Sequence, residues 1–305
     1  YTALTYLDTH LLHARPTYIA YTNRVFIRIF IFLKKHANRF KNHRRVPAHT
    51  DPLSRIFGPL TTVIDETDKQ PRESNIRYYH LLKGAHVFSF LKQYASPEKY
   101  FLDAGAGRGP YCMLASPLFK NVTCWEYNEN ELAHARKACA RFSNISYARV
   151  DLRNTPAYDG SFDVIVCSEV LEHIPEREQA VRELRRLLRP GGTLLVSMPN
   201  SWSLFYLRVR IVHRALLKKK LSPGDPDWEF IQHLLFPFWK IEKLLKNGGF
   251  QIIRRSGVNI LPISEKIRTR LTERYPKIAF IYLVIERSLS RICPFFCSFY
   301  FLTLQ

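Results

Sequence analysis

An acidic residue followed by three alternating glycines, Asp103-Ala-Gly105-Ala-Gly107-Arg-Gly109, is the part of this 305-residue chain best suited to hold a ligand. It follows the apolar run Tyr100–Leu102, which predicts a short buried strand that ends in a glycine-rich turn. Glycine has no Cβ and accepts positive φ, so such a turn lets the backbone approach a ligand closely. The spacing differs from the G-x-G-x-x-G run of dinucleotide-binding folds. Because an acid before the glycines repels a pyrophosphate, we expect a nucleoside ligand that carries positive charge.

A second group of reactive side chains is Glu169-Val-Leu-Glu172-His173. If a helical turn begins there, residues three and four apart share one face. Two carboxylates and an imidazole can supply a general base. They can also bind Mg²⁺ or another divalent metal, with the distant His233 as a fourth ligand. In the metal-free alternative, these side chains orient a loop through hydrogen bonds, and His173 or His233 acts as a base or has a structural role.

Two further acids end predicted strands. Glu126 ends the strand that begins at Asn121, and Asp151 follows the strand that begins at Ile145. An acid at the tip of the second parallel strand can accept hydrogen bonds from two ribose hydroxyls. The carboxylate of Asp151 can accept from an exocyclic amine such as that of adenine.

Strand and helix patterns alternate along the chain from residue 100 onward. The central run Val164-Ile-Val166 is continuously apolar, as in a parallel strand that is buried on both faces. This alternation predicts a doubly wound α/β sheet. The expected strands are 100–102, 121–126, 145–150, 161–169, 193–197, 251–260 and 295–304, and the expected helices include 73–94, 110–119, 176–188, 239–246 and part of 264–292.

Residues 100–200 resemble the S-adenosylmethionine (SAM) binding half of the class I SAM-dependent methyltransferases. The matching pieces are the acid-glycine run, Glu126, Asp151, Phe162-Asp163, Glu169-Val-Leu-Glu-His173 and Leu188-Arg-Pro-Gly-Gly-Thr193. The resemblance implies a Rossmann-like, seven-stranded sheet with an antiparallel last strand, preceded by a helical N-terminal extension. We expect residues 1–95 to form that extension or a lid. Residues 96–305 would form the SAM-binding domain, with 201–240 as a cap over the substrate.

The resemblance also implies a SAM-binding role for each matching residue. Asp103 and the turn Gly105-Ala106-Gly107 would hold the methionine part of SAM, although Asp103 could instead act only through hydrogen bonds inside the turn. Glu126 would grip the ribose, with Tyr127 beside the adenine. The remaining residues would be Asp151 and Leu152 at the adenine, and Cys167 and Ser168 near the sulfonium.

The E-x-x-E-H run with a later histidine resembles two branches of this family. One branch is the ubiquinone-type O-methyltransferases, which act on polyprenyl catechols. The other is the small-RNA 3′-terminal 2′-O-methyltransferases, in which a metal grips vicinal hydroxyls. The E-V-L-E-H run also occurs in family members with no known metal, so the resemblance leaves the metal open.

Charge and hydrophobicity restrict the partners. The net charge is +20, from 46 basic and 26 acidic residues, and this excess favours anionic partners. Residues 17–40 alternate apolar and basic side chains, which is typical of a helix that lies on an anionic membrane or a nucleic acid, or packs over its own domain. The sequence contains no run of about 18 uncharged apolar residues, so we expect no ordinary membrane-spanning helix. The six scattered cysteines predict a reducing compartment, and hence a cytoplasmic protein that can contact a membrane peripherally.

We therefore expect a SAM-dependent enzyme that methylates an oxygen of a hydrophobic or lipid-linked small acceptor. The second expectation is a metal-assisted RNA 2′-O-methyltransferase, and the third is a non-catalytic subunit with the methyltransferase fold. The sequence indicates no oligomeric state.

Overall fold

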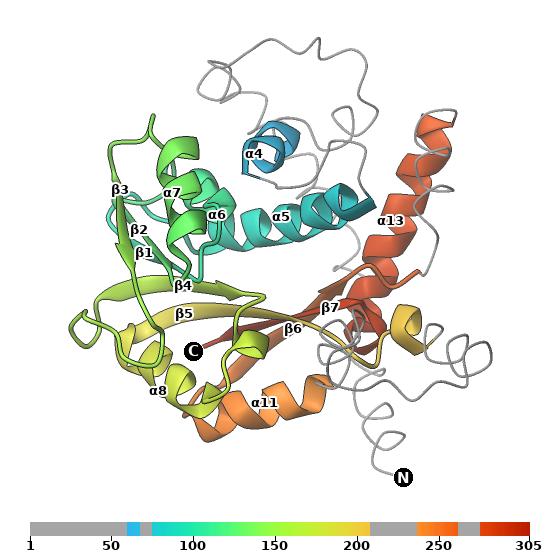
Figure 1. The fold of residues 1–305 in the computed structure, drawn as a ribbon. Helices are drawn as coiled ribbons and strands as arrows, with labels where there is room; N and C mark the ends of the chain where they lie inside the picture. Colours follow the sequence, from blue (N-terminus) through green and yellow to red (C-terminus); the bar gives the residue numbers. More distant parts are fainter. Residues whose placement is uncertain (1–59, 68–74, 208–236, 262–274) are drawn as a thin grey trace, which may run out of the picture.

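A seven-stranded sheet forms the centre of the part of the chain that the structure describes (Figure 1). The structure is a computed structural model and describes residues 60–67, 75–207, 237–261 and 275–305. The strand order is β3-β2-β1-β4-β5-β7-β6, and β7 runs antiparallel to both of its neighbours. The expected Rossmann-like sheet with an antiparallel last strand is therefore confirmed.

Helices and strands follow one another in the expected alternation, labelled here as in Figure 1. The strands are β1 (Tyr100–Ala104), β2 (Asn121–Glu126), β3 (Ile145–Arg149), β4 (Phe162–Ser168), β5 (Leu188–Pro199), β6 (Ile252–Val258) and β7 (Phe299–Leu304). The α-helices are α4 (Leu60–Thr67), α5 (Asn75–Tyr94), α6 (Pro110–Ala115), α7 (Glu129–Ala138), α8 (Arg177–Leu187), α11 (Phe238–Asn247) and α13 (Pro276–Ile292). Two short 3₁₀ turns are η2 (Leu171–His173) and η3 (Pro294–Phe296).

The order of the strands reverses between β1 and β4. From β1 the chain continues outward to β2 and β3, whereas β4 pairs with the other edge of β1 and leads to β5. In such sheets ligands bind at the carboxyl ends of the strands, beside the point of reversal. The glycine turn after β1 and the Glu169 segment after β4 are thus brought together at one edge of the sheet.

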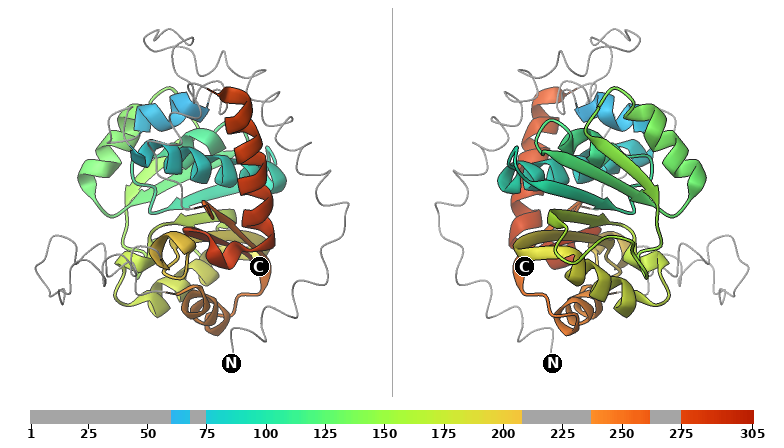
Figure 2. Two further views of the ribbon diagram at one scale, coloured as in Figure 1. Left: turned by 90° about the vertical axis from the view of Figure 1, so that its right-hand side faces the viewer. Right: turned by 90° about the vertical axis from the view of Figure 1, so that its left-hand side faces the viewer.

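Two apolar cores cover the two faces of the sheet (Figures 1 and 2). One core lies under α4, α5, α6, α7 and α13, and the other lies under α8 and α11. Successive strand residues point to opposite faces, so Phe101 enters the first core and Leu102 the second. The helices α4 and α5 belong to the expected N-terminal extension, yet Leu60 and Leu81 are buried in the same core as Phe101.

Some expected boundaries were wrong. The helix after the glycine turn ends at Ala115 instead of Phe119, because Pro117 has no N–H to continue the helical ladder. The last strand begins at Phe299 instead of Phe295, since Pro294 starts a 3₁₀ turn. The predicted amphipathic segment 17–40 and most of the cap 201–240 lie outside the described residues. In the described part of the chain, no helix is both long and apolar enough to span a bilayer.

A buried carboxylate joins α11 to the outer strands. Glu242 is 5% exposed and accepts hydrogen bonds from the Tyr300 hydroxyl at 2.6 Å and from Nε and Nη2 of Arg255, both at 2.9 Å. Burial alone would raise the pKa of Glu242, but the hydrogen bonds from Arg255 and Tyr300 outweigh it and hold that pKa below the usual value. The folded state therefore favours the ionised form of Glu242.

We expect Glu242→Gln to lower the free energy of unfolding by about 3 kcal/mol at pH 7, because Arg255 would lose its buried counter-charge. A group with a lowered folded pKa stabilises the protein above its unfolded pKa, and this contribution disappears as the pH falls through the folded value. The difference between wild type and variant should therefore shrink below about pH 4.5. Urea denaturation at pH 7 and pH 3.5 measures it, with Lys246→Gln as the control, since Lys246 is half exposed and lies 3.9 Å from the same carboxylate. An equal loss in both variants, or a difference that does not depend on pH, would contradict this.

Candidate functional site

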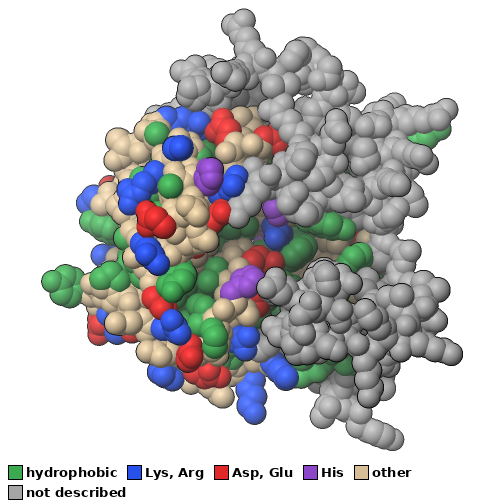
Figure 3. Space-filling view, in the orientation of Figure 1, with side chains coloured by type: hydrophobic (Ala, Val, Ile, Leu, Met, Phe, Trp, Pro, Cys, Tyr) green, Lys and Arg blue, Asp and Glu red, His purple; other side chains and the backbone are tan. Residues whose placement is uncertain are grey.

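A cavity of about 1000 Å³ opens at the edge of the sheet where the strand order reverses. Its walls come from the segments after β1, β2, β3 and β4, together with α4 and α5. Figure 3 shows a hollow on this face with charged and histidine side chains around it. Ligand pockets usually measure roughly 300 to 1,000 Å³, so this one has room for a nucleoside and a second small molecule.

The turn after β1 requires glycine. Gly105, Gly107 and Gly109 all have positive φ, at 82°, 54° and 80°. A Cβ at Gly105 would lie 2.4 Å from Cγ2 of Val170, so even alanine would not fit there. The amides of Gly105 and Ala106 both donate to the Trp125 carbonyl, at 2.9 and 2.8 Å. These bonds hold the turn against the end of β2, where it lines the cavity.

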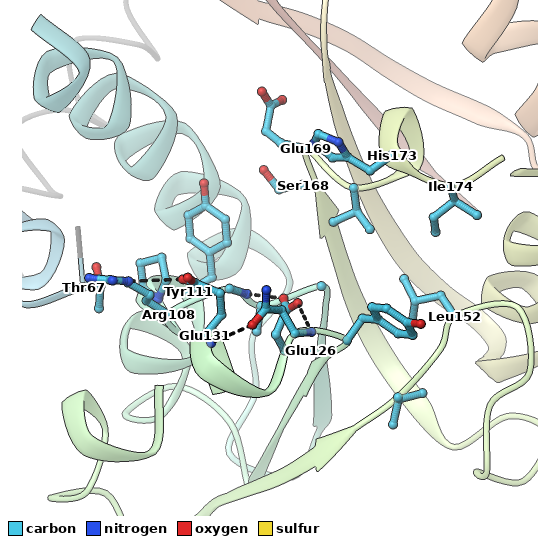
Figure 4. A pocket seen from close by; sticks show the side chains of 18 of the residues that line it. Thr67, Arg108, Tyr111, Glu126, Glu131, Leu152, Ser168, Glu169, His173 and Ile174 are labelled. Carbon is cyan, nitrogen blue, oxygen red and sulfur yellow. Dashed lines mark hydrogen bonds and ion pairs between the residues drawn. The ribbon is translucent and has the colours of Figure 1, made fainter. Parts of the chain in front are cut away.

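Glu126 connects the two turns that follow β1 and β2 (Figure 4). Its Oε2 accepts from the Gly107 amide at 2.7 Å, and its Oε1 accepts from the Asn128 amide at 2.9 Å. A carboxylate has about four acceptor positions, so two remain for a ligand in the cavity that Glu126 lines. Beside it, Tyr127 is 60% exposed and also lines the cavity. Glu126 thus retains the capacity to accept from a ribose diol.

Asp151 is already engaged by its own chain. Both of its carboxylate oxygens accept from the Arg153 side chain, at 2.7 to 3.1 Å, and Oδ1 also accepts from the Arg153 amide. The hydrogen bonds from the Arg153 side chain lower the pKa of Asp151 and keep it ionised. Asp151, Leu152 and Arg153 all line the cavity, so the adenine end of the predicted site is held by an ion pair that the sequence analysis did not anticipate.

Asp103 and Cys167 point into the core, away from the cavity. Asp103 is 1% exposed, and its Oδ2 accepts from the Cys112 thiol at 3.4 Å. Burial raises the pKa of Asp103 to about 7, against the lowering effect of the Cys112 hydrogen bond. Cys167 is fully buried in the second core. Asp103 is thus hydrogen-bonded to α6, and its proposed roles at the methionine part of SAM or inside the turn both stay predictions.

Ser168, Glu169 and His173 lie together on the wall opposite Glu126 (Figure 4). Glu169 has φ of 59°, and its Oε1 accepts from the Ser197 hydroxyl at 3.0 Å, while its Oε2 lies 3.6 Å from Nζ of Lys83. The hydroxyls of Ser168 and Ser197 are hydrogen-bonded at 2.7 Å. These contacts fix Glu169 directly after the carboxyl end of β4, beside the exposed side chain of His173.

Glu172 is not among the residues that line the cavity, although His173 follows it in the chain. It belongs to η2 with His173, whereas Glu169 precedes η2 with a left-handed backbone, so the expected helical face shared by all three was wrong. Glu172 Oε2 is buried and has no hydrogen-bond partner. Burial, and then the nearby charge of Glu169, raises the pKa of Glu172.

Three of the four predicted metal ligands, Glu169, Glu172 and His173, lie in the part of the chain that the structure describes. Among the described residues, no group of three or more His, Cys, Asp or Glu side chains is placed to hold a metal ion. His233 lies outside those residues. Glu169, Glu172 and His173 therefore do not form a metal site by themselves.

Two helices contribute residues to the cavity that are not among the predicted site residues. Ile64 and Thr67 of α4, and His80 and Lys83 of α5, line the cavity. His80 and Lys83 are three residues apart and so share one helix face, which is a signal that the sequence carries. Tyr111 of α6 also lines the cavity, where burial raises its pKa.

We expect Glu126→Gln to weaken SAM binding roughly 10- to 100-fold, because hydrogen bonds to a charged group contribute more than those to an amide. The variant also weakens the Gly107 contact that shapes the turn. Isothermal titration calorimetry with SAM measures the change. Glu129→Gln is the matched control, since Glu129 is exposed on the first turn of α7. If both variants bind SAM as the wild type does, Glu126 does not hold the cofactor.

Comparison with known proteins agrees with this geometry. The sequence model of the family described as "Methyltransferase domain" matches residues 102–196. A Mycolicibacterium smegmatis protein named a probable S-adenosylmethionine-dependent methyltransferase is 38% identical over 99 residues, or 32% of this chain and 37% of that relative. The ubiquinone biosynthesis O-methyltransferase of Coxiella burnetii is 26% identical over 192 residues, or 61% of this chain and 78% of that protein.

The fold is also found among solved structures. The crystal structure of the [4+2]-cyclase SpnF matches with a TM-score of 0.50 and 17% identity, over 83% of this chain and 92% of that one. This likeness concerns the fold alone.

The chain spans little more than a third of the length of the M. smegmatis relative. The region that contains the cavity's glycine turn and strand ends, residues 102–196, is thus a methyltransferase domain, similar to those of SAM-dependent methyltransferases.

Proposed function

We propose that the protein is a SAM-dependent methyltransferase that methylates a hydroxyl oxygen of a hydrophobic or lipid-linked small acceptor. One observation supports this most directly. The glycine turn at Gly105 and the side chain of Glu126 line the same cavity as Glu169 and His173. The similarity to the C. burnetii ubiquinone biosynthesis O-methyltransferase, over 78% of that protein, supports the choice of an oxygen acceptor.

The cofactor end of the cavity fits SAM by its donor set. When bound, SAM supplies a methyl group on a sulfonium, which a nucleophile can attack without further activation. The turn from Gly105 to Gly107 lines the cavity, and Glu126 offers free acceptor positions for two hydroxyls. Leu152 gives an apolar surface against which the adenine ring of SAM can pack. On this wall Glu131 and Asp151 are paired with Arg108 and Arg153, so the carboxylate of Glu126 is the one that best suits a ligand carrying positive charge.

The opposite wall suits the acceptor. A hydroxyl must lose its proton as it becomes methylated, and a positioned base contributes about 10²- to 10⁴-fold to such a step. His173 lines the cavity and has an exposed ring, so its imidazole can take that proton and pass it to water. Glu169 is held by Ser197 and Lys83, and it can orient the acceptor or stabilise the protonated imidazole. Positioning the acceptor contributes the remainder of the rate.

Apolar side chains support a hydrophobic acceptor. Ile64 of α4 and Val170, Ile174 and Pro175 after β4 line the cavity. Contact of residues 17–40 with a membrane would bring such an acceptor near the cavity. This membrane contact and the cytoplasmic location both stay predictions. A metal-assisted RNA 2′-O-methyltransferase is the second candidate, favoured by the net charge of +20. A non-catalytic subunit with the methyltransferase fold is the third candidate.

We expect His173→Gln to lower kcat by roughly 10²- to 10⁴-fold while SAM affinity is retained, because only the proton transfer loses its base. Rates with a hydroxylated acceptor, together with SAM titrations, separate the two effects. His134→Gln on the exposed side of α7 controls for loss of an imidazole elsewhere. If kcat is unchanged in His173→Gln, another group takes the proton.

The acceptor class can be identified with SAM that carries a labelled methyl group. We expect the label to enter the organic phase when the protein is incubated with an extract of source cells and the products are partitioned. Label in RNA would instead favour the second candidate. Loss of label in the presence of EDTA would indicate that Glu169 or His173 binds a metal together with residues outside the described part. SAM binding without any label in an acceptor-rich extract would favour a non-catalytic subunit.

A further inference from the structure

A second cavity lies away from the cofactor site, between α5, α13 and the outer strands β6 and β7. Its volume is about 80 Å³. The helices α5 and α13 cover the same face of the sheet there (Figures 1 and 2). None of the residues that line it takes part in the site described above.

Positive charge dominates the lining of this cavity. Arg254 comes from β6, and Arg287 and Arg291 come from α13. The acid among the described lining residues is Glu286, and both of its oxygens are already used. Its Oε1 accepts from the Ile260 amide at 2.6 Å and the Ser290 hydroxyl at 3.1 Å, and its Oε2 accepts from the Leu261 amide at 3.0 Å.

The ionisable groups respond to this excess of positive charge. His86 of α5 is half-buried in the cavity wall against Phe301 and is hydrogen-bonded to the Ser256 hydroxyl at 2.9 Å. Burial, and then the charges of Arg254, Arg287 and Arg291, lowers the pKa of His86 to about 3, so the ring is neutral. Burial, and then Arg291 and Arg254, lowers the pKa of Arg287 to about 9. The guanidinium groups therefore repel one another around the cavity, and an anion would relieve the repulsion.

The cavity also offers hydrogen-bond donors. The side chain of Arg254 is half-buried and makes no hydrogen bond or ion pair with any residue that the structure describes. Ser89 and Gln93 of α5 and Thr303 of β7 add polar groups to the wall. Guanidinium groups bind phosphate oxygens in pairs of parallel hydrogen bonds, and hydroxyl and amide groups complete such sites. A small space with several guanidinium groups is suited to a compact, multiply charged anion.

We propose that this cavity binds a phosphate group, either of a small free anion such as pyrophosphate or of a lipid headgroup, with Arg254 as a direct ligand. The site is independent of the proposed methyl transfer. It shares only α5 with the cofactor cavity, which is lined by His80 and Lys83 of that helix instead of His86 and Ser89.

The test uses the whole chain at constant ionic strength. Calorimetric titration with inorganic pyrophosphate should show binding to the wild type, and Arg254→Gln should weaken it roughly 10- to 100-fold, as expected for loss of hydrogen bonds to a charged group. Arg254→Lys should restore part of the affinity. Arg182→Gln is the matched control, because Arg182 is exposed on α8 on the opposite face of the sheet. SAM binding by each variant shows that the domain is folded.

A second arm distinguishes the source of the phosphate. Phosphatidylcholine vesicles with and without phosphatidic acid are sedimented with each protein. Sedimentation that needs phosphatidic acid and is lost in Arg254→Gln but not in Arg182→Gln assigns the site to a lipid headgroup. Pyrophosphate binding without sedimentation assigns it to a small free anion. The proposal is overturned if neither probe binds, or if Arg254→Gln and Arg182→Gln weaken binding equally.

Discussion

The hydrogen bond from the Gly107 amide to the Glu126 carboxylate, 2.7 Å long, is the contact on which the candidate site depends. It joins the turn after β1 to the turn after β2, and the amides of Gly105 and Ala106 reinforce it through the Trp125 carbonyl. The geometry is available only because Gly105 has positive φ and no Cβ to meet Val170. Val170 follows β4, so the same close approach fixes the distance between the cofactor wall and the wall that carries Glu169 and His173.

Buried charge is controlled differently at each place in this fold. At Glu242 a full set of donors keeps the carboxylate ionised. At Asp103 and Glu172 burial dominates, and the pKa of each carboxyl rises. The unpaired buried oxygen of Glu172 lies directly beside the reactive wall, because Glu172 and His173 are neighbours in η2. An unsatisfied polar atom is costly in a core, so the position of this one beside the cavity agrees with a site that is built for binding.

The sequence was sufficient for the sheet and for the location of the site. Uniformly apolar strands and a glycine run after β1 determine which strand ends meet, and the strand order follows from that connectivity. The direction of single side chains was harder to predict. Asp103 has the same strand parity as Phe101 and so points under α6 to Cys112, a signal that was present in the sequence but not used.

Other features of the site had no local signal. The positive φ of Glu169 is rare for a residue other than glycine, and it separates Glu169 from Glu172 despite their helical spacing. The contact of Lys83 with Glu169 joins α5 to the end of β4, and no sequence pattern connects segments so far apart. Long-range packing decided both outcomes.

The net charge of +20 is distributed unevenly between the two cavities. At the cofactor cavity Arg108, Arg153 and Lys83 are each paired with an acid, so a cationic cofactor meets no excess of positive charge there. At the second cavity Arg254, Arg287 and Arg291 line the wall, and both oxygens of Glu286 accept hydrogen bonds from other groups. Since α5 forms a wall of both, one helix separates a region suited to a cation from a region suited to an anion. The charge that the composition reports as a single number is therefore distributed over two cavities that share α5 as a wall.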